Sequence, residues 1–163
     1  MGKLKILNLK KEDLKNLKIL LNDLNTFNKL EIKVALEMAS EYLNKKSKSD
    51  YKFLVAKKNG DLAGFVCFGP TPLTESTYDL YWIAVSKNYQ RKSFGKILLK
   101  ECEEKVKKMG GKLLVIETSS TNNYKKARKF YEKFGYKKIT KIKDFYKPKD
   151  NKLIYIKYFN GGR

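Results

Sequence analysis

A polar, cationic segment with one glycine separates a strand-like run from a helix-like run in the middle of the chain. The apolar run DLYWIAV ends at SKNYQRKSFGK (86–96), and ILLKECEEKVKKMG follows directly. A helix that begins near Gly95 would point unpaired backbone N–H groups and the positive end of its dipole into this segment. Further donors and charge would come from Gln90, Arg91, Lys92 and Lys96. The segment predicts a cradle for a phosphate or pyrophosphate group, and an ordinary cationic turn is the alternative.

Two familiar phosphate-binding patterns do not fit this segment, and histidine chemistry is excluded altogether. A dinucleotide fingerprint needs three glycines in an N-terminal βαβ unit, and a P-loop ends in Gly-Lys-Ser/Thr. The chain has no histidine, which rules out a Ser-His-Asp triad, a Cys-His pair and the usual Cys/His zinc site. Cys67 and Cys102 lie in apolar patterns that predict core residues rather than nucleophiles. We expect no metal site.

The segment VSKNYQRKSFGKILL resembles motif A of the GCN5-related N-acetyltransferases (GNAT), in which Gln/Arg-x-x-Gly-x-Gly/Ala receives the pyrophosphate of acetyl-CoA. Gln90, Ser93 and Gly95 occupy the three defined positions. Ser93 departs from the family, which usually has glycine there, and we expect weakened or altered binding at worst. The resemblance implies that main-chain groups of Ile83, Ala84 and Val85 hold the pantetheine and the acetyl carbonyl. It also implies pyrophosphate contacts from Gln90, Arg91, Lys92, Ser93, Phe94, Gly95 and Lys96.

A second segment, ETSSTNNYKKARKFYEKFGY, resembles motif B of the same family. The matching positions are Ala127, Phe130, Tyr131, Gly135 and Tyr136. The preceding loop is a residue or two longer than in many members, so its asparagines are slightly displaced. By resemblance, Asn123 and Lys126 are candidates for contacts to the pantetheine and the adenosine 3′-phosphate. The resemblance covers roughly residues 51–159.

The order of the predicted elements agrees with this family. Hydrophobic periodicity indicates the order β-α-α-β-β-β-α-β-α-β-β, an α/β fold with a mixed sheet flanked by helices, in one domain over 1–163. Strands are expected at 3–9, 51–60, 61–70, 78–86, 110–120, 136–146 and 151–159. Helices are expected at 10–24, 28–46, 95–109 and 124–135. In the second helix, the apolar spacing predicts one buried face formed by Leu30, Val34, Met38 and Tyr42.

The family resemblance implies acetyl transfer from acetyl-CoA to a primary amine by direct attack in a ternary complex. An ammonium has a pKa of about 10, so a base assists its deprotonation, and without histidine a carboxylate, a water chain or a carbonyl must serve. Glu117, near the C-terminal end of its strand, is the first candidate, because a glutamate on this strand is proposed as base in ribosomal-protein N-terminal acetyltransferases. Asp79 is the second. The structural alternatives are a hydrogen-bond network for Glu117 and a solvated strand face for Asp79.

The resemblance also implies that Tyr131, four residues before the motif B glycine, is the general acid that protonates the leaving thiolate. A phenol stays protonated at neutral pH, so it is able to donate to a thiolate. A buried aromatic role beside Phe130 and Phe134 is the alternative. Nothing near Cys67 in the sequence would activate its thiol, so an acyl-enzyme route is not favoured.

The charge pattern bears on partners and location. The net charge is +20, but arginine occurs only at 91, 128 and 163, and the lysines are scattered rather than gathered in a stripe, which does not favour nucleic acid. No apolar run is long enough to span a bilayer or resembles a signal peptide, so we expect a cytoplasmic protein. A homodimer is left open.

The acceptor remains open among a small amine, an amino acid and a peptide N-terminus. Tyr146 and the helix at 28–46 are the candidate walls of the acceptor site, because the C-terminal hairpin resembles the tyrosine-bearing hairpin of amino-terminal and amino-acid acetyltransferases. The alternative function is a non-catalytic module of the same fold that binds acyl-CoA or nucleic acid.

Overall fold

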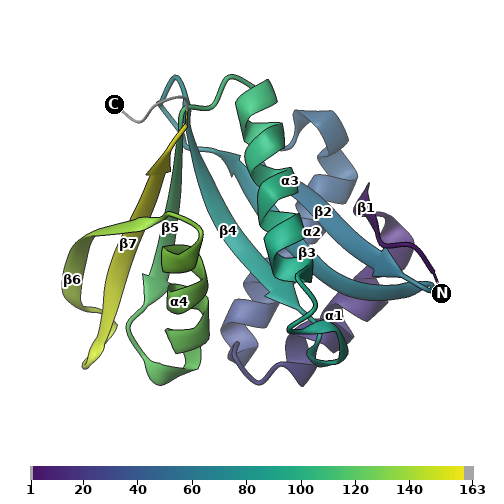
Figure 1. Cartoon of the computed structure of the whole chain (residues 1–163), viewed down its shortest axis with the longest axis horizontal. Helices are drawn as coiled ribbons and strands as arrows, with labels where there is room; N and C mark the ends of the chain where they lie inside the picture. The colour runs from purple at the N-terminus through teal and green to yellow at the C-terminus, as the bar shows by residue number, and fades with distance from the viewer. Residues whose placement is uncertain (1, 160–163) are drawn as a thin grey trace.

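Residues 2–159 are described by a computed structural model, in which seven strands form one mixed sheet with helices on both faces (Figure 1). The strand order is β1-β2-β3-β4-β5-β7-β6. The strands are β1 (Lys5–Asn8), β2 (Lys52–Lys58), β3 (Asp61–Pro70), β4 (Thr77–Val85), β5 (Leu113–Ser119), β6 (Lys137–Lys147) and β7 (Asp150–Tyr158). Only the pairing of β4 with β5 is parallel among these strands.

Four α-helices cover the two faces of the sheet. They are α1 (Leu14–Asp23), α2 (Lys29–Lys45), α3 (Phe94–Lys108) and α4 (Lys125–Lys133). Figure 1 shows α3 and α4 on one face and α1 and α2 behind the sheet. The predicted element order is confirmed, and the ends differ by a few residues. The largest difference is at the first helix, where a 3-10 turn (Lys11–Asp13) precedes α1.

The start of α2 follows from its sequence, and the predicted buried face of this helix is right only in part: Met38 and Tyr42 are half-buried against the core, whereas Leu30 and Val34 are exposed. Asn28 Oδ1 accepts a hydrogen bond from the Glu31 N–H at 2.8 Å, and Glu31 Oε2 accepts one from the Asn28 N–H, which together form a capping box. Leu30 and Val34 are 68% and 38% exposed. The buried stripe is instead made by Ile32, Ala35 and Ala39. Small alanines allow the helix to approach the sheet closely, which apolar spacing alone does not reveal.

Strand β4 pairs with β3 along almost its whole length but with β5 only over its first part. The parallel pairs run from Thr77↔Leu113 to Leu80↔Ile116. At this point β4 contains a bulge, because Cys67 lies opposite Trp82 and Phe68 lies opposite Leu80, which leaves Tyr81 without a direct partner on β3. Beyond the bulge, β4 and β5 diverge (Figure 1). We call this divergence, bounded by Tyr81–Val85 and Glu117–Ser119, the fork.

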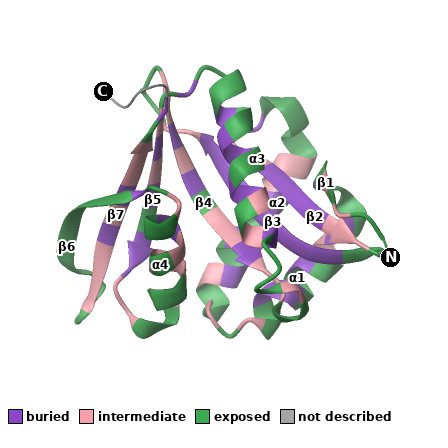
Figure 2. Ribbon diagram, in the orientation of Figure 1, coloured by how far each residue is buried: buried purple, intermediate pink, exposed green. Residues whose placement is uncertain are grey.

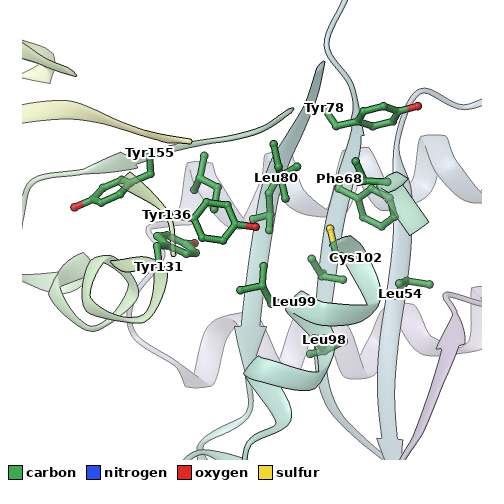
Figure 3. Close-up of a cluster of buried hydrophobic side chains, with 14 of the residues drawn as sticks. Leu54, Phe68, Tyr78, Leu80, Leu98, Leu99, Cys102, Tyr131, Tyr136 and Tyr155 are labelled. Atoms are coloured by element: carbon green, nitrogen blue, oxygen red, sulfur yellow. The ribbon is translucent and has the colours of Figure 1, made fainter. Parts of the chain in front are cut away.

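The sheet separates two apolar cores, one against each helical layer. Figure 2 shows the central strands largely buried, whereas β6 is exposed along its length. The core beneath α3 and α4 contains Cys102, and the core beneath α1 and α2 contains Cys67 (Figure 3 shows part of the first). Burial raises the pKa of both thiols well above the usual value. The prediction that both cysteines are core residues is confirmed.

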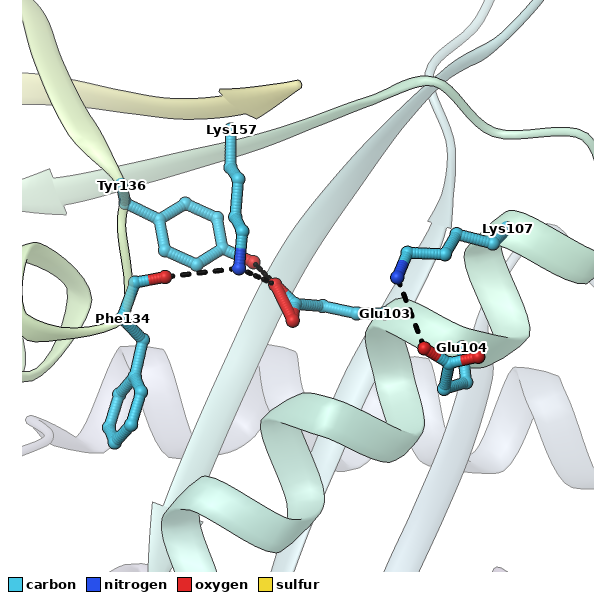
Figure 4. Close-up of polar contacts among 6 residues, drawn as sticks. All are labelled: Glu103, Glu104, Lys107, Phe134, Tyr136 and Lys157. Carbon is cyan, nitrogen blue, oxygen red and sulfur yellow. Dashed lines mark hydrogen bonds and ion pairs between the residues drawn. The ribbon is translucent and has the colours of Figure 1, made fainter. Parts of the chain in front are cut away.

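A buried carboxylate joins α3 to β7 and to the residue that follows α4. Glu103 Oε2 accepts hydrogen bonds from the Tyr136 hydroxyl and from Lys157 Nζ, each at 2.8 Å, and Lys157 also donates to the Phe134 carbonyl at 3.0 Å (Figure 4). Burial and the Glu103 carboxylate raise the pKa of Tyr136, so its hydroxyl remains a donor. A buried carboxylate needs such partners, so this cluster fixes α3 relative to the C-terminal strands.

Replacing Lys157 by methionine should destabilise the fold, because Glu103 would keep its charge in a buried position with Tyr136 as its remaining partner. We expect a loss of about 2 kcal/mol in the free energy of unfolding, less than for a fully buried pair because the Lys157 side chain is 29% exposed. Urea denaturation of the purified variant measures it. The matched control is Lys107→Met, which removes the solvent-exposed pair with Glu104 and should cost under about 0.5 kcal/mol. Equal losses would contradict the role of the buried cluster.

Candidate functional site

The loop before α3 presents a set of backbone N–H groups that the helix cannot satisfy. The first hydrogen bond of the helical ladder is donated by Ile97 to the Ser93 carbonyl at 3.0 Å. The N–H groups of Phe94, Gly95 and Lys96 precede this bond, and among residues 2–159 they have no backbone partner. The side chains of Arg91, Lys92, Ser93 and Lys96 are exposed around them. The geometry is that of the anion cradle predicted from the sequence.

Two non-glycine residues of this loop have a left-handed backbone. Arg91 has φ of 61° and Ser93, the residue before α3, has φ of 65°. Left-handed backbone costs a residue with a Cβ about 1 kcal/mol, so glycine is favoured at such positions. Position 93 is the one at which the motif A pattern usually has glycine. The departure therefore leaves the backbone conformation in place and adds strain and a hydroxyl.

Gln90 and Gly95 have different surroundings from those expected. The Gln90 side-chain amide donates to the Val85 carbonyl at 3.1 Å, so it ties the loop to the end of β4 rather than pointing freely into the cradle. A Cβ on Gly95 would lie 3.4 Å from the Phe130 ring and 3.6 Å from Val85 Cγ2, which are ordinary contacts. Gly95 therefore lies where α3, β4 and α4 meet.

The predicted main-chain contacts lie along one edge of the fork. Ile83, Ala84 and Val85 pair with β3 on one side, and within residues 2–159 no strand pairs with them on the β5 side. On that side the Val85 carbonyl accepts the hydrogen bond from Gln90, and the remaining peptide groups face the opening between the strands, where a ligand could enter. An extended ligand chain with amide groups would pair with such an edge as a strand does.

Tyr131 is the buried tyrosine whose hydroxyl lacks a protein partner. The hydroxyls of Tyr78, Tyr136 and Tyr155 donate to the Met109 carbonyl, Glu103 and Glu132, respectively. No hydrogen bond of the Tyr131 hydroxyl is found among residues 2–159. No side-chain oxygen or nitrogen in that part of the chain is both sealed from solvent and unpaired, so this hydroxyl retains access to open space. Burial raises the pKa of Tyr131, which keeps the phenol protonated.

The ring of Tyr131 is fixed by aromatic neighbours from α4, from the segment between α4 and β6, and from β7. Its centroid lies 5.8 Å from that of Phe130, and 6.1 Å from those of both Tyr136 and Tyr155, and Figure 3 shows the three tyrosines together beside α4. These tilted and edge-to-face contacts orient the ring. A buried aromatic role and an available hydroxyl are therefore combined in one residue.

The two candidate carboxylates lie on the face of the sheet opposite α3 and α4, at different depths. Asp79 lies opposite Val115, within the paired part of β4 and β5, whereas Glu117 follows the last pair and lies at the opening of the fork. Asp79 Oδ2 accepts a hydrogen bond from the Thr71 hydroxyl at 2.7 Å. Burial raises the pKa of Asp79, the nearby Glu117 adds to this, and the bond from Thr71 opposes it. Glu117 is 47% exposed and pairs with Lys152.

Acidic and aromatic side chains from distant parts of the chain surround Glu117. Burial, followed by the nearby charges of Glu117, Asp150 and Glu31, raises the pKa of Tyr146 to about 12. The Tyr124 hydroxyl donates to Glu31 Oε1 at 2.9 Å, which joins α2 to the loop before α4. The predicted walls, Tyr146 and the helix at 28–46, thus lie on the same side as Glu117. We call Glu31, Glu117, Tyr146 and Asp150, together with the neighbouring Tyr81, Tyr124 and Lys152, the acidic face.

Several members of the acidic face were missed by sequence reasoning. Tyr81 is the bulged residue, and its ring meets Tyr51 edge to face with centroids 5.6 Å apart. Tyr124 and Lys152 occupy no defined motif position. Their neighbours on this face come from strands and helices far away in the sequence, so spacing along the chain does not reveal them. The bulge that exposes Tyr81 has no reliable signal in a single strand's residue pattern.

Two further predicted ligand residues, Asn123 and Lys126, are exposed at the start of α4. The structure does not bring either into contact with the α3 cradle. Nearby, Arg128 donates to the carbonyls of Ser119 and Thr121 at 2.8 and 2.7 Å, which fixes the loop after β5. Residues 2–159 contain no group of His, Cys, Asp and Glu arranged to hold a metal ion. None of the helices described in that range is long and apolar enough to cross a membrane.

Comparison with solved structures gives the same fold throughout. A GNAT-family protein from Desulfovibrio desulfuricans is 36% identical, with 96% of this chain and 99% of that chain covered and a TM-score of 0.92. The ribosomal-protein-S18-alanine N-acetyltransferase from Escherichia coli is 21% identical, with 99% and 97% covered and a TM-score of 0.78. The PaiA N-acetyltransferase from Thermoplasma acidophilum, solved with coenzyme A, is 22% identical, with 96% and 99% covered and a TM-score of 0.75.

The last two likenesses show the fold alone. No curated protein sequence is matched by this chain. The family model described as Acetyltransferase (GNAT) family matches residues 18–136, which include both motifs and the fork. Together with the relative that is 36% identical over nearly the whole of both chains, this match shows that the chain belongs to the GNAT family of acetyltransferases.

Proposed function

We propose that this chain, as one domain over 1–163, transfers an acetyl group from acetyl-CoA to a primary amine in a ternary complex. The observation that carries the proposal is Tyr131, a protonated phenol on the helix that borders the fork, whose hydroxyl has no hydrogen-bond partner among residues 2–159. Three tyrosines that are similarly buried each donate to a partner, so a free hydroxyl here is consistent with a ligand partner.

The residues around the fork fit acetyl-CoA. A pyrophosphate would accept hydrogen bonds from the N–H groups at the start of α3 and would be neutralised by Arg91, Lys92 and Lys96. The pantetheine would pair with the free edge of Ile83–Val85, in the manner of an added strand. Acetyl-CoA supplies an activated acetyl group on sulfur. With these proposed contacts, its thioester would lie inside the fork, between the bulge on β4 and the end of β5.

The proton transfers are assigned by position. Tyr131 donates a proton to the leaving sulfur. Its raised pKa keeps the phenol protonated, and its aromatic neighbours hold the ring in place. Glu117, at the opening of the fork, accepts a proton from the incoming ammonium. Asp79 lies within the paired part of β4 and β5, and its carboxylate accepts a hydrogen bond from the Thr71 hydroxyl. We therefore assign Asp79 a supporting role. Cys67 is buried with a raised pKa, which does not suit an acyl-enzyme.

The acidic face favours an acceptor that carries positive charge. Glu117, Asp150 and Glu31 lie close to Tyr146 in a chain whose net charge is +20. Carboxylates and aromatic rings attract an alkylammonium both electrostatically and through the ring faces. The acceptor class that fits best is therefore a small primary ammonium or a peptide amine without a nearby carboxylate.

Replacing Ser93 by glycine should stabilise the protein and keep or tighten acetyl-CoA binding, because it removes the left-handed strain without moving the loop. We expect a gain of about 1 kcal/mol, which raises the melting temperature by about 2–4 °C. Thermal denaturation and calorimetric titration with acetyl-CoA measure the two effects. The opposite change at a matched site, Gly110→Ala, should destabilise, since Gly110 has φ of 87° and open space around it. A lower melting temperature for Ser93→Gly would contradict the assigned strain.

Replacing Tyr131 by phenylalanine should lower kcat by about 10²-fold or more, because the leaving sulfur would lose its proton donor. The affinity for acetyl-CoA should change by less than about twofold, since the ring packing is unchanged. Steady-state release of thiol with a panel of primary amines measures the first, and calorimetry the second. The control is Tyr155→Phe, which loses the bond to Glu132 and about 1 kcal/mol of stability but leaves the fork intact. Full activity of Tyr131→Phe would remove it as the acid.

A pair of isosteric variants distinguishes the roles of the two carboxylates, Glu117 and Asp79. Glu117→Gln should reduce kcat by about 10²-fold, and Asp79→Asn by only a few-fold. Burial raises the pKa of Asp79, so the wild type loses stability as the pH rises through that pKa, and Asp79→Asn does not. The variant should therefore melt at or above the wild-type temperature at pH 7, with the difference vanishing in acid. The reverse order of kcat losses would make Asp79 the base.

A further inference from the structure

A primary ammonium already lies against the proposed base. Lys152 Nζ is 2.8 Å from Glu117 Oε2 and 3.9 Å from the centroid of the Phe145 ring. The Lys152 side chain is only 13% exposed, which is low for a lysine. A carboxylate on one side and an aromatic face on the other are the two groups that bind an alkylammonium best.

The position of Lys152 is that of an acceptor amine. It lies on β7 opposite Ser119 of β5, so its side chain is on the same face of the sheet as Glu117. The charge of Lys152 also acts on Asp79, which places its ammonium near both candidate carboxylates. An external amine that paired with Glu117 Oε2 in this way would take the position that Lys152 Nζ occupies.

We propose that Lys152 is an acetylation site of this protein, modified by the chain itself from acetyl-CoA. The inference rests on the proposed function. Glu117 accepts one proton from the Lys152 ammonium, Nζ forms a bond to the acetyl carbonyl carbon, and the carbon–sulfur bond breaks. The sulfur takes a proton from Tyr131, and the second proton lost by Nζ returns to Tyr131. The net change is ammonium plus thioester to amide plus thiol, with one proton released from Glu117 to solvent.

The modification would alter the site that performs it. The amide of acetylated Lys152 is neutral, so the ion pair with Glu117 is lost and Glu117 is left open to an external ammonium. A single intramolecular turnover would therefore change the affinity of the acidic face for amines. Unmodified and modified protein should differ in KM for an amine acceptor more than in acetyl-CoA affinity.

The test is peptide mapping by mass spectrometry after the full-length protein is incubated with acetyl-CoA. Acetylation should appear first on Lys152, with a rate that does not depend on protein concentration. Lys157 is the matched control, because it lies on the same strand, is also 2.8 Å from a glutamate and is 29% exposed, yet it faces Glu103 on the opposite side of the sheet. Lys152 should be modified at least about tenfold faster than Lys157.

A chemical reagent gives a readout that does not depend on enzyme turnover. Acetic anhydride in the absence of acetyl-CoA should label Lys152 more slowly than exposed lysines, because Lys152 is paired with Glu117 and is only 13% exposed. Glu117→Gln should slow acetylation of Lys152 from acetyl-CoA by about tenfold or more, and should leave or raise its labelling by anhydride. Lys152→Arg, with an unchanged melting temperature, should remove the acetylated peptide from the map.

The outcomes separate this inference from the proposed function. Three results overturn intramolecular modification of Lys152. They are acetylation rates that rank lysines by solvent exposure, equal rates on Lys152 and Lys157, and a rate that rises with protein concentration. Transfer to added amines with Lys152 unmodified overturns the inference and leaves the proposed function in place. No transfer to any amine, with acetyl-CoA bound, overturns both.

Discussion

The early end of the β4–β5 pairing is the constraint on which the site depends. Parallel hydrogen bonds hold the two strands together as far as Leu80 and Ile116, and the bulge at Tyr81 then turns β4 away. An unpaired strand edge is normally an aggregation hazard, so a fold that keeps one in its centre needs a use for it. Here the free edge lies between the start of α3, with its unpaired N–H groups, and α4, with Tyr131. In the proposed function, the divergence that follows this one irregularity provides the path of the cofactor, the position of the acid and the opening to the acidic face.

Several carboxylates of this chain bind buried tyrosine hydroxyls or lysine ammonium groups, and this pairing sets Tyr131 apart from the other buried tyrosines. Glu103 accepts hydrogen bonds from Tyr136 and Lys157, and Glu132 accepts one from Tyr155. These partners satisfy buried hydroxyls that would otherwise be costly. Tyr131 lies among the same rings without such a partner. The chain has no histidine, and the proposed function therefore assigns the proton transfers to the Tyr131 phenol and the Glu117 carboxylate at the fork.

Charge is distributed unevenly between the two ends of the fork. The α3 side carries Arg91, Lys92 and Lys96 and attracts an anion. The opposite face gathers Glu31, Glu117 and Asp150 around Tyr146, despite a net charge of +20. Under the proposed function, this charge distribution directs the anionic cofactor and a cationic acceptor to opposite sides of the sheet. Lys152 is the exception on the acidic face, and its pairing with Glu117 is where the structure departs from a simple amine-binding pocket.

The sequence by itself determined the element order, the family and the start of α3 after a cationic loop, because these depend on local signals: hydrophobic period, the residues before a helix and two short motifs. The sequence did not determine which residues of α2 are fully buried. The burial of Ile32, Ala35 and Ala39 depends on how closely the helix packs on the sheet. Tertiary structure alone decided the bulge at Tyr81, the missing partner of Tyr131 and the contact of Lys152 with Glu117. Each of these depends on strand register and on neighbours far apart in the chain, which residue types and spacing do not encode.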